Sequence, residues 1–102
     1  MTLEEISKEY GIHIGDLEAY TALKRLNDGR LVGIMPLMFH WTLHVDINPF
    51  GYADKYCFAT RDMAETAIVE WDGHGDPGNQ WHRHIGTGRR RNLETGEEWI
   101  AF

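Results

Sequence analysis

The chain has 102 residues, of which 42% are hydrophobic and 12% aromatic, and its formal net charge is −6. This length is typical of a single domain, and the apolar content is enough for a core, which excludes wholesale disorder. No apolar run reaches the roughly 18 residues of a membrane span, so the sequence predicts no membrane protein.

The cellular compartment follows from the cysteine count and the first residues. The single cysteine, Cys57, excludes an internal disulfide and favours a reducing cytoplasm. It lies between Tyr56 and Phe58, so we expect a core thiol. The N-terminal stretch MTLEEISKEY carries acids where a signal peptide needs a basic and then an apolar segment. We therefore expect a cytoplasmic protein, in the host cell if the gene is viral.

Two helices are expected within residues 1–27. Thr2 followed by Glu5 is a capping-box signature, and Gly11 marks the end of the first helix. Asp16 can cap a second helix that runs to about Asn27. The apolar residues that share one face of this second helix are Ala19, Leu23 and Leu26.

Residues 30–47 predict two strands. The first, RLVGIMPL, is expected to break at Pro36, and the second, residues 38–47, ends at the turn NPFG. The second strand alternates strictly, so its two sides can be read from the sequence. The side expected in the core carries Phe39, Trp41, Leu43, Val45 and Ile47. The side expected to be a solvent face or the edge of an interface carries His40, Thr42, His44 and Asp46.

The C-terminal half predicts further strands and one helix. KYCFA is a short apolar strand, and Thr60 can cap a helix at about 61–72. WHRHI and RRRNL resemble the arms of a hairpin around GTG, and EEWIAF is a last strand. The whole chain therefore predicts one compact α+β domain over residues 1–102. The N-terminal segment, residues 1–27, is expected to be helical, and an antiparallel meander sheet over 30–102 is packed on one face by two or three helices.

The histidines suggest a weak metal site. His82 and His84 are expected to share a strand face, with His74 and Asp76 on the loop before them. Imidazole and carboxylate suit zinc, but no CxxC or HExxH frames the spacing. A metal-dependent hydrolase is therefore an alternative only. The chain has no GxSxG elbow and no phosphate-binding loop, so we expect no enzyme and no cofactor.

The one basic cluster lies in residues 81–91, which carry four arginines and no acid. Beside Trp81 these side chains could hold phosphates or stack on bases, or they could pair with acids of the same domain. The arginines are Arg83, Arg89, Arg90 and Arg91.

The N-terminal region offers a second nucleic-acid hypothesis. EISKEYGIHIGDLEAYTALKRL resembles a helix-turn-helix, and the strands behind it could form a wing. The acids Asp16 and Glu18 would open the recognition helix and face phosphates unfavourably. A nucleic-acid-binding regulator is therefore an alternative function.

The stretches GYADKYCFATRDMAETAIVEWDGHGDP and WHRHIGTGRRRN resemble small uncharacterised proteins encoded by phages, prophages and α-proteobacterial genomes. The resemblance covers roughly residues 39–99, and its most specific segments are 56–58, 71–73 and 88–91. It implies a phage context, in which small acidic proteins often bind and block a host machine, as anti-CRISPR proteins do. It implies no catalytic residues.

Our leading hypothesis from the sequence is a non-enzymatic, phage-type binding module that blocks a basic surface on a bacterial host protein complex. A homodimer is compatible with this hypothesis, and a membrane partner is not expected. The acidic residues expected to form the contact surface are Glu4, Glu5, Glu9, Asp16, Glu18, Glu65, Glu70 and Asp72.

Overall fold

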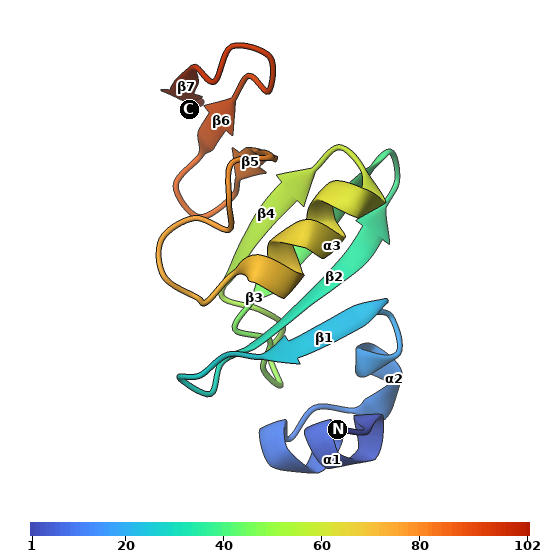
Figure 1. Ribbon diagram of the computed structural model, residues 1–102. Helices are drawn as coiled ribbons and strands as arrows, with labels where there is room; N and C mark the ends of the chain where they lie inside the picture. The colour runs from blue at the N-terminus through green and yellow to red at the C-terminus, as the bar shows by residue number, and fades with distance from the viewer.

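The structure, a computed structural model that describes residues 1–102, confirms the α+β fold (Figure 1). Its sheet has seven antiparallel strands in the order β1-β2-β3-β4-β5-β6-β7, so each strand pairs with its neighbours in sequence. The strands are β1 (Ala22–Arg25), β2 (Leu31–Leu37), β3 (His40–Val45), β4 (Asp54–Phe58), β5 (Trp81–His84), β6 (Arg89–Arg91) and β7 (Glu98–Ile100). The helices are α1 (Leu3–Tyr10), α2 (Ile14–Leu17) and α3 (Arg61–Glu70).

Helix α3 covers one face of the sheet, across β2, β3 and β4 (Figure 1). Thr60 caps it, as expected, because its hydroxyl accepts a hydrogen bond from the Met63 amide at 3.3 Å. Its buried face packs on strand residues whose side chains point to this side, and Trp41 lies partly buried at the margin. The main members of this core are Val32, Ile34, Leu43, Val45, Tyr56, Phe58, Ala64, Ala67, Ile68, Trp71 and Trp81.

A second, smaller core forms where α1 and α2 pack at the other side of the sheet. Ile6 and Leu17 contact Leu31 there, and Leu31 points away from α3 because its neighbour Val32 points toward it. The expectation that all helices cover one face is therefore wrong. The sheet has an apolar side chain to bury at Leu31 on its second face, and the short N-terminal helices cover it.

The expected helix from Asp16 to about Asn27 is also wrong. Helix α2 ends at Leu17, and Ala22–Arg25 forms β1, so the N-terminal segment is not helical throughout. The physical reason is that Leu23 and Leu26 belong to different cores: Leu23 packs with α1 and α2, and Leu26 packs under α3. A helix would have placed both on one face.

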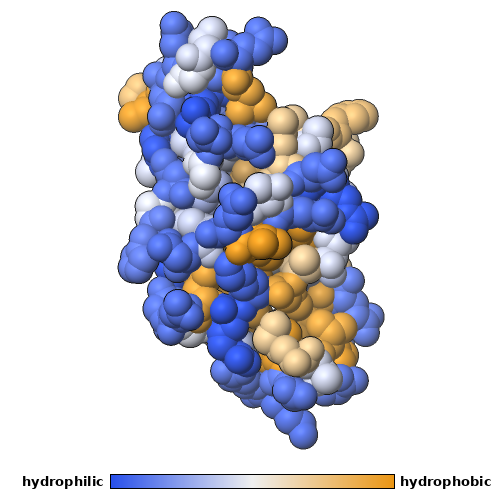
Figure 2. Space-filling model, viewed as in Figure 1, coloured by the Kyte–Doolittle hydropathy of each residue, from blue (hydrophilic) through white to orange (hydrophobic).

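Pro36 does not break its strand, because β2 continues to Leu37. The pairing of β1 with β2 ends at Ile34, so the outer edge of β2 is free at Pro36 and needs no amide donor there. The turn that follows exposes Met38 and Phe39, at 87% and 94%. Figure 2 shows pale orange side chains projecting at the upper right, where Figure 1 places this turn. The expectation from the alternation that Phe39 lies in the core is therefore wrong.

The polar side of β3 is not a solvent face. Thr42 is fully buried and His44 is 7% exposed, because side chains from distant segments cover them. The Tyr20 hydroxyl is 2.7 Å from His44 Nδ1, and the Tyr52 ring stacks on the imidazole with 3.9 Å between ring centroids. The sequence pattern correctly separated the two sides within β3, but it could not show these covering residues. The expectation that Ile47 lies on the side of Leu43 and Val45 is wrong, because β3 ends at Val45 and the chain turns at Asp46, where φ is 59°, so that Ile47 packs in the second core.

The molecule is elongated, with extents of 42 × 24 × 22 Å, and its termini lie at opposite ends (Figure 1). The C-terminal strands β5, β6 and β7 extend the sheet beyond the region that α3 covers. None of the three helices has the length and apolar content that crossing a lipid bilayer requires.

Candidate functional site

A bulge separates the two histidines of β5. Cys57 pairs with Arg83 and Phe58 pairs with Trp81, so His82 is an extra residue on β5 that has no partner on β4. As a result His84 stacks on Tyr56 on the α3 side, whereas the ring of His82 contacts His40 on the opposite face. The expectation that His82 and His84 share a strand face is therefore wrong.

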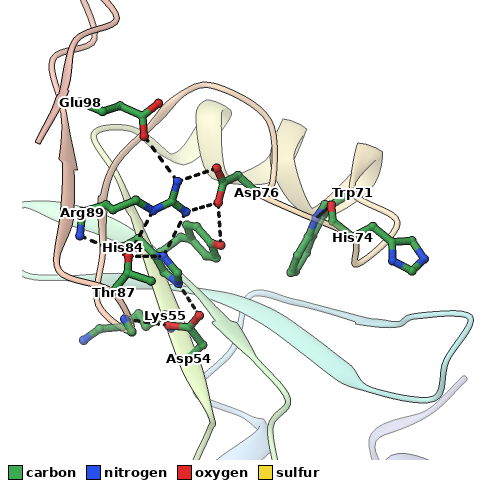
Figure 3. A network of polar contacts seen from close by, with 11 residues as sticks. Asp54, Lys55, Trp71, His74, Asp76, His84, Thr87, Arg89 and Glu98 are labelled. Atoms are coloured by element: carbon green, nitrogen blue, oxygen red, sulfur yellow. Dashed lines mark hydrogen bonds and ion pairs between the residues drawn. The ribbon is translucent and has the colours of Figure 1, made fainter. Parts of the chain in front are cut away.

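His84 is the centre of a polar network on the α3 side (Figure 3). Its Nε2 hydrogen-bonds to the Asp54 carboxylate, and its Nδ1 lies 2.9 Å from the Thr87 hydroxyl and 3.3 Å from the guanidinium of Arg89. Because a guanidinium can only donate, these partners assign the ring proton to Nε2, with Nδ1 as acceptor. The Gly86 amide donates to the other Asp54 oxygen at 3.0 Å, which fixes the carboxylate.

Arg89 joins three segments of this network. Figure 3 shows its guanidinium between Asp76 of the 71–80 loop and Glu98 of β7, and it forms an ion pair with each. The hydrogen bonds from Arg89 hold the pKa of the Asp76 carboxyl below its usual value. Burial, together with the 3.0 Å hydrogen bond that the Tyr56 hydroxyl donates to Asp76, raises the pKa of Tyr56. The loop and the C-terminal hairpin are thereby tied to the sheet.

The order hydroxyl, imidazole, carboxylate in Thr87, His84 and Asp54 is that of a proton relay in hydrolytic triads. Thr87 Oγ1, however, also accepts hydrogen bonds from the backbone amide and Nε of Arg89, at 3.3 and 3.2 Å. Thr87, His84 and Asp54 do not line the hollows of about 420 and 190 Å³ described below. The hydrogen bonds of the relay hold the hairpin.

The expected arginine cluster is divided between the two faces. Arg89 is engaged in the network, and Arg91 lies on the same side, 5.9 Å from the ring centroid of Trp81. Arg83 and Arg90 are cross-strand partners on the other face. The sequence interpretation that these arginines pair within the domain is confirmed for Arg89, since it is the one member of the cluster that forms ion pairs.

The four candidate metal ligands do not converge. Asp76 and His84 are both bound to Arg89, His82 lies across the sheet, and Figure 3 shows His74 on the far side of Trp71. No three His, Cys, Asp or Glu side chains of the protein lie together in an arrangement that could hold a metal ion. A cation in the network would also meet the positive charge of Arg89.

A groove of about 420 Å³ lies between α3 and the 71–80 loop. Three carboxylates line it, those of Glu70, Asp72 and Asp76, and His74 is its one basic side chain. Glu70 and Asp72 also line a second hollow of about 190 Å³ toward β1, so they stand on the ridge between the two hollows. Both are exposed, and neither forms an ion pair.

The expected acidic surface is divided into two groups. Glu65, Glu70 and Asp72 belong to α3 and the loop after it, and Glu65 pairs with Arg61 one turn away. The remaining acids lie on the N-terminal helices at the end of the molecule marked by the N-terminus (Figure 1); they are Glu4, Glu5, Glu9, Asp16 and Glu18. Within this second group, Glu9 pairs with Arg25.

The N-terminal region does not form the expected helix-turn-helix. Helix α2 has four residues, and the segment that was to continue it pairs with β2 as β1. A recognition helix needs more than one turn to reach base edges in a groove. Asp16 and Glu18 therefore lie at a short helix on the protein surface rather than at the start of a recognition helix.

Sequence reasoning missed Asp54 and Thr87 as members of the His84 network. Asp54 is 30 positions from His84, and no spacing rule links a strand end to a hairpin so far along the chain. Only the strand register could have found the pair, since Tyr56 and His84 are directly opposite.

Comparisons with known protein families, with curated protein sequences and with solved structures gave no match, so function has to be inferred from the geometry of the surface.

Proposed function

We propose that this protein is a non-catalytic binding module whose acidic groove takes basic side chains of a bacterial host protein complex and thereby blocks that surface. The observation that carries the proposal is the groove between α3 and the 71–80 loop, with the unpaired carboxylates of Glu70 and Asp72 on its rim. A cleft lined by charges of one sign focuses its electric field and so attracts ligands of the opposite charge.

The chemistry of the groove suits a lysine or arginine side chain. The aliphatic part of such a side chain can lie against Met63 and the edge of Trp71, while its charged end reaches Glu70 and Asp72. Asp76 contributes less, because Arg89 already neutralises it. The contact would be strong at low salt and weaker as ions screen it.

The resemblance to phage-type proteins supports a bacterial host complex as the partner. The negative net charge supports a basic surface on that partner, such as one built to hold nucleic acid.

The proposal is tested by affinity capture from a bacterial host lysate treated with nuclease, comparing the parent chain with the variant Glu70→Gln/Asp72→Asn. We expect the parent to retain a basic protein and the variant to lose it. Asn at position 72 still accepts the hydrogen bond that the His74 amide donates to Asp72 at 2.9 Å, so the loop should keep its shape.

The matched control is Glu94→Gln/Glu97→Gln, which removes the same charge at two exposed positions outside the groove. It should capture the same protein as the parent. Equal capture by the parent and the groove variant would overturn the proposal, as would equal losses in the groove variant and the control.

A further inference from the structure

The face of the sheet opposite α3 carries a continuous row of side chains across β3 to β7. Directly paired residues on neighbouring antiparallel strands point to the same side, so the register alone defines the row. Thr42 pairs with Cys57, which pairs with Arg83, and Arg83 pairs in turn with Arg90. Arg90 pairs with Trp99 in the last strand.

No helix covers this row. Helix α3 lies on the opposite face, and α1 and α2 pack around Leu31 near the first strands. Arg83 is exposed and Trp99 is 52% exposed, although an indole side chain is normally buried or partnered. Thr42 and Cys57, at the β3 and β4 end of the row, are buried, so its accessible part lies on β5 to β7. That part consists of the exposed Arg83, the half-buried Arg90 and the indole ring of Trp99.

The charged side chains that the strand register places on this face are all cations. Lys55, Arg83 and Arg90 form no ion pair. All three lie near the buried Cys57 thiol: burial raises the pKa of this thiol, and the three positive charges partly oppose that rise. Burial, His40 and the cations Arg83 and Arg90 lower the pKa of His82. The ring of His82 lies edge-on to that of His40, with 5.9 Å between the ring centroids. Three permanent cations and two imidazoles thus gather on one sheet face without a carboxylate paired to any of them.

Arg90 is also incompletely satisfied. Its Nε is buried and has no hydrogen-bond partner, so the side chain is held in place without its full set of acceptors. By contrast Arg89, one residue away on the other face, is saturated by Asp76 and Glu98. Arg91 also has a buried Nε without a partner, but it lies on the α3 side against Trp81, so Arg90 is the arginine of β6 that belongs to this face.

We propose that this face binds single-stranded nucleic acid, with phosphates at Lys55, Arg83 and Arg90 and a base stacked on Trp99. Neighbouring strands lie roughly 5 Å apart, so the cations form a track across the strands rather than a point site. A sheet face with cations and an exposed aromatic ring suits unpaired, extrudable bases, whereas it offers no helix or ribbon to enter the groove of a duplex. The acidic groove lies on the α3 side, so this proposal stands independently of the proposed function.

The test is fluorescence anisotropy of a labelled oligothymidine titrated with the parent chain and its variants at several salt concentrations. Arg83→Gln/Arg90→Gln should weaken binding at least tenfold at low salt, and the slope of log K against log salt should become shallower by about 1.4, the value for two lost phosphate contacts. Trp99→Ala should weaken binding about 5- to 150-fold, as expected for one lost stacking contact.

The matched control is Lys8→Gln/Arg61→Gln, which removes two exposed cations that lie outside this face. It should bind the oligonucleotide within about twofold of the parent, and circular dichroism with thermal unfolding shows that each variant is folded. The proposal is overturned if the parent does not bind the oligonucleotide at low salt, or if the control loses as much affinity as Arg83→Gln/Arg90→Gln. It is also overturned if polyaspartate displaces the oligonucleotide as efficiently per charge, because the face would then bind any polyanion, acidic proteins included.

Discussion

His44 is a neutral histidine built into the sheet. Burial and the positive charge of Lys55 lower its pKa from about 6.5 to about 4. The Tyr20 hydroxyl donates to Nδ1, in keeping with a tyrosine whose pKa burial raises to about 12, and the ring proton on Nε2 points toward Thr42 Oγ1 at 3.4 Å. A second proton on the ring, at Nδ1, would remove the acceptor of the hydrogen bond that Tyr20 donates.

This arrangement predicts a loss of stability in mild acid. Because the pKa of His44 is lower in the folded than in the unfolded state, the unfolded chain binds more protons below pH 6.5. The contribution is therefore fully present above pH 6.5 and is lost as the pH falls toward 4, by on the order of 3 kcal/mol. Urea unfolding at a series of pH values should show this decline in the parent and a shallower one in His44→Gln. His74→Gln, which removes an exposed histidine, should decline as the parent does; equal slopes in all three proteins would contradict the assignment.

Gly33 leaves the space that Tyr20 needs to reach His44. A Cβ at this position would lie 2.7 Å from Tyr20 Cδ1 and 3.1 Å from the Ala22 carbonyl oxygen. We expect Gly33→Ala to displace the tyrosine ring and to lower the free energy of unfolding by about 1–3 kcal/mol. A double-mutant cycle checks the cause: in a Tyr20→Leu background the same substitution should cost less. An unchanged cost would mean that the clashes with the Leu23 side chain, at 2.8 Å, and with the Ala22 carbonyl oxygen are responsible.

The C-terminal end of α3 depends on one lysine from β1. Lys24 Nζ donates to the carbonyl oxygens of Ile68, Val69 and Trp71 at 3.0, 3.1 and 2.6 Å, where the helix would otherwise leave acceptors unpaired. This contact also holds Trp71 in place. The Trp71 indole donates a hydrogen bond to the His74 carbonyl oxygen at 3.1 Å, at the beginning of the 71–80 loop.

We expect Lys24→Met to lower the free energy of unfolding by about 1–3 kcal/mol, because several carbonyl groups lose a charged donor. The aliphatic portion of the side chain is kept by methionine, so the loss reports the ammonium group. Thermal or urea unfolding measures it, and Lys8→Met on the exposed side of α1 serves as the control. Equal stability of the two variants would show that the capping contact adds nothing.

The sequence was informative wherever one short stretch decides the structure. Thr2, Gly11 and Thr60 set the ends of α1 and α3, and the alternation of β3 and the GTG turn set strands and a hairpin. It failed where two distant segments compete for the same residues. Apolar positions at 19, 23 and 26 fit a helix locally, and pairing with β2 overrides that preference.

The candidate sites show the same division. The sequence identified the acids of α3 and the arginines of the last hairpin as candidate binding residues, but it did not show on which face of the molecule each of them lies. The bulge opposite Cys57 and Phe58 places His82 and His84 on opposite faces of the sheet, and no residue in WHRHI predicts this bulge. Likewise Asp54 meets His84 only because neighbouring strands are in register, which is a property of the whole sheet.

The molecule as a whole carries its two proposed binding surfaces on opposite sides of one sheet. The acidic groove lies between α3 and the 71–80 loop, and the basic row lies on the face that α3 does not cover. We therefore expect the two sites to act independently. Glu70→Gln/Asp72→Asn should bind oligothymidine as the parent does, and Arg83→Gln/Arg90→Gln should still capture the basic partner after nuclease treatment. The variant that combines both pairs of substitutions should lose as much protein capture as the groove variant and as much oligothymidine affinity as Arg83→Gln/Arg90→Gln. A clearly different loss of either would show that the surfaces are coupled.

The strictly sequential order of the strands has a consequence for how the chain is made. Each strand pairs with the strand synthesised just before it, and α3 packs on β2, β3 and β4, all of which precede it. A growing chain therefore finds every pairing partner already outside the ribosome, with no need to wait for a distant segment. We expect assembly to advance from β1 toward β7 during translation, with the pairing of β7 on β6, where Glu98 meets Arg89, as the last step.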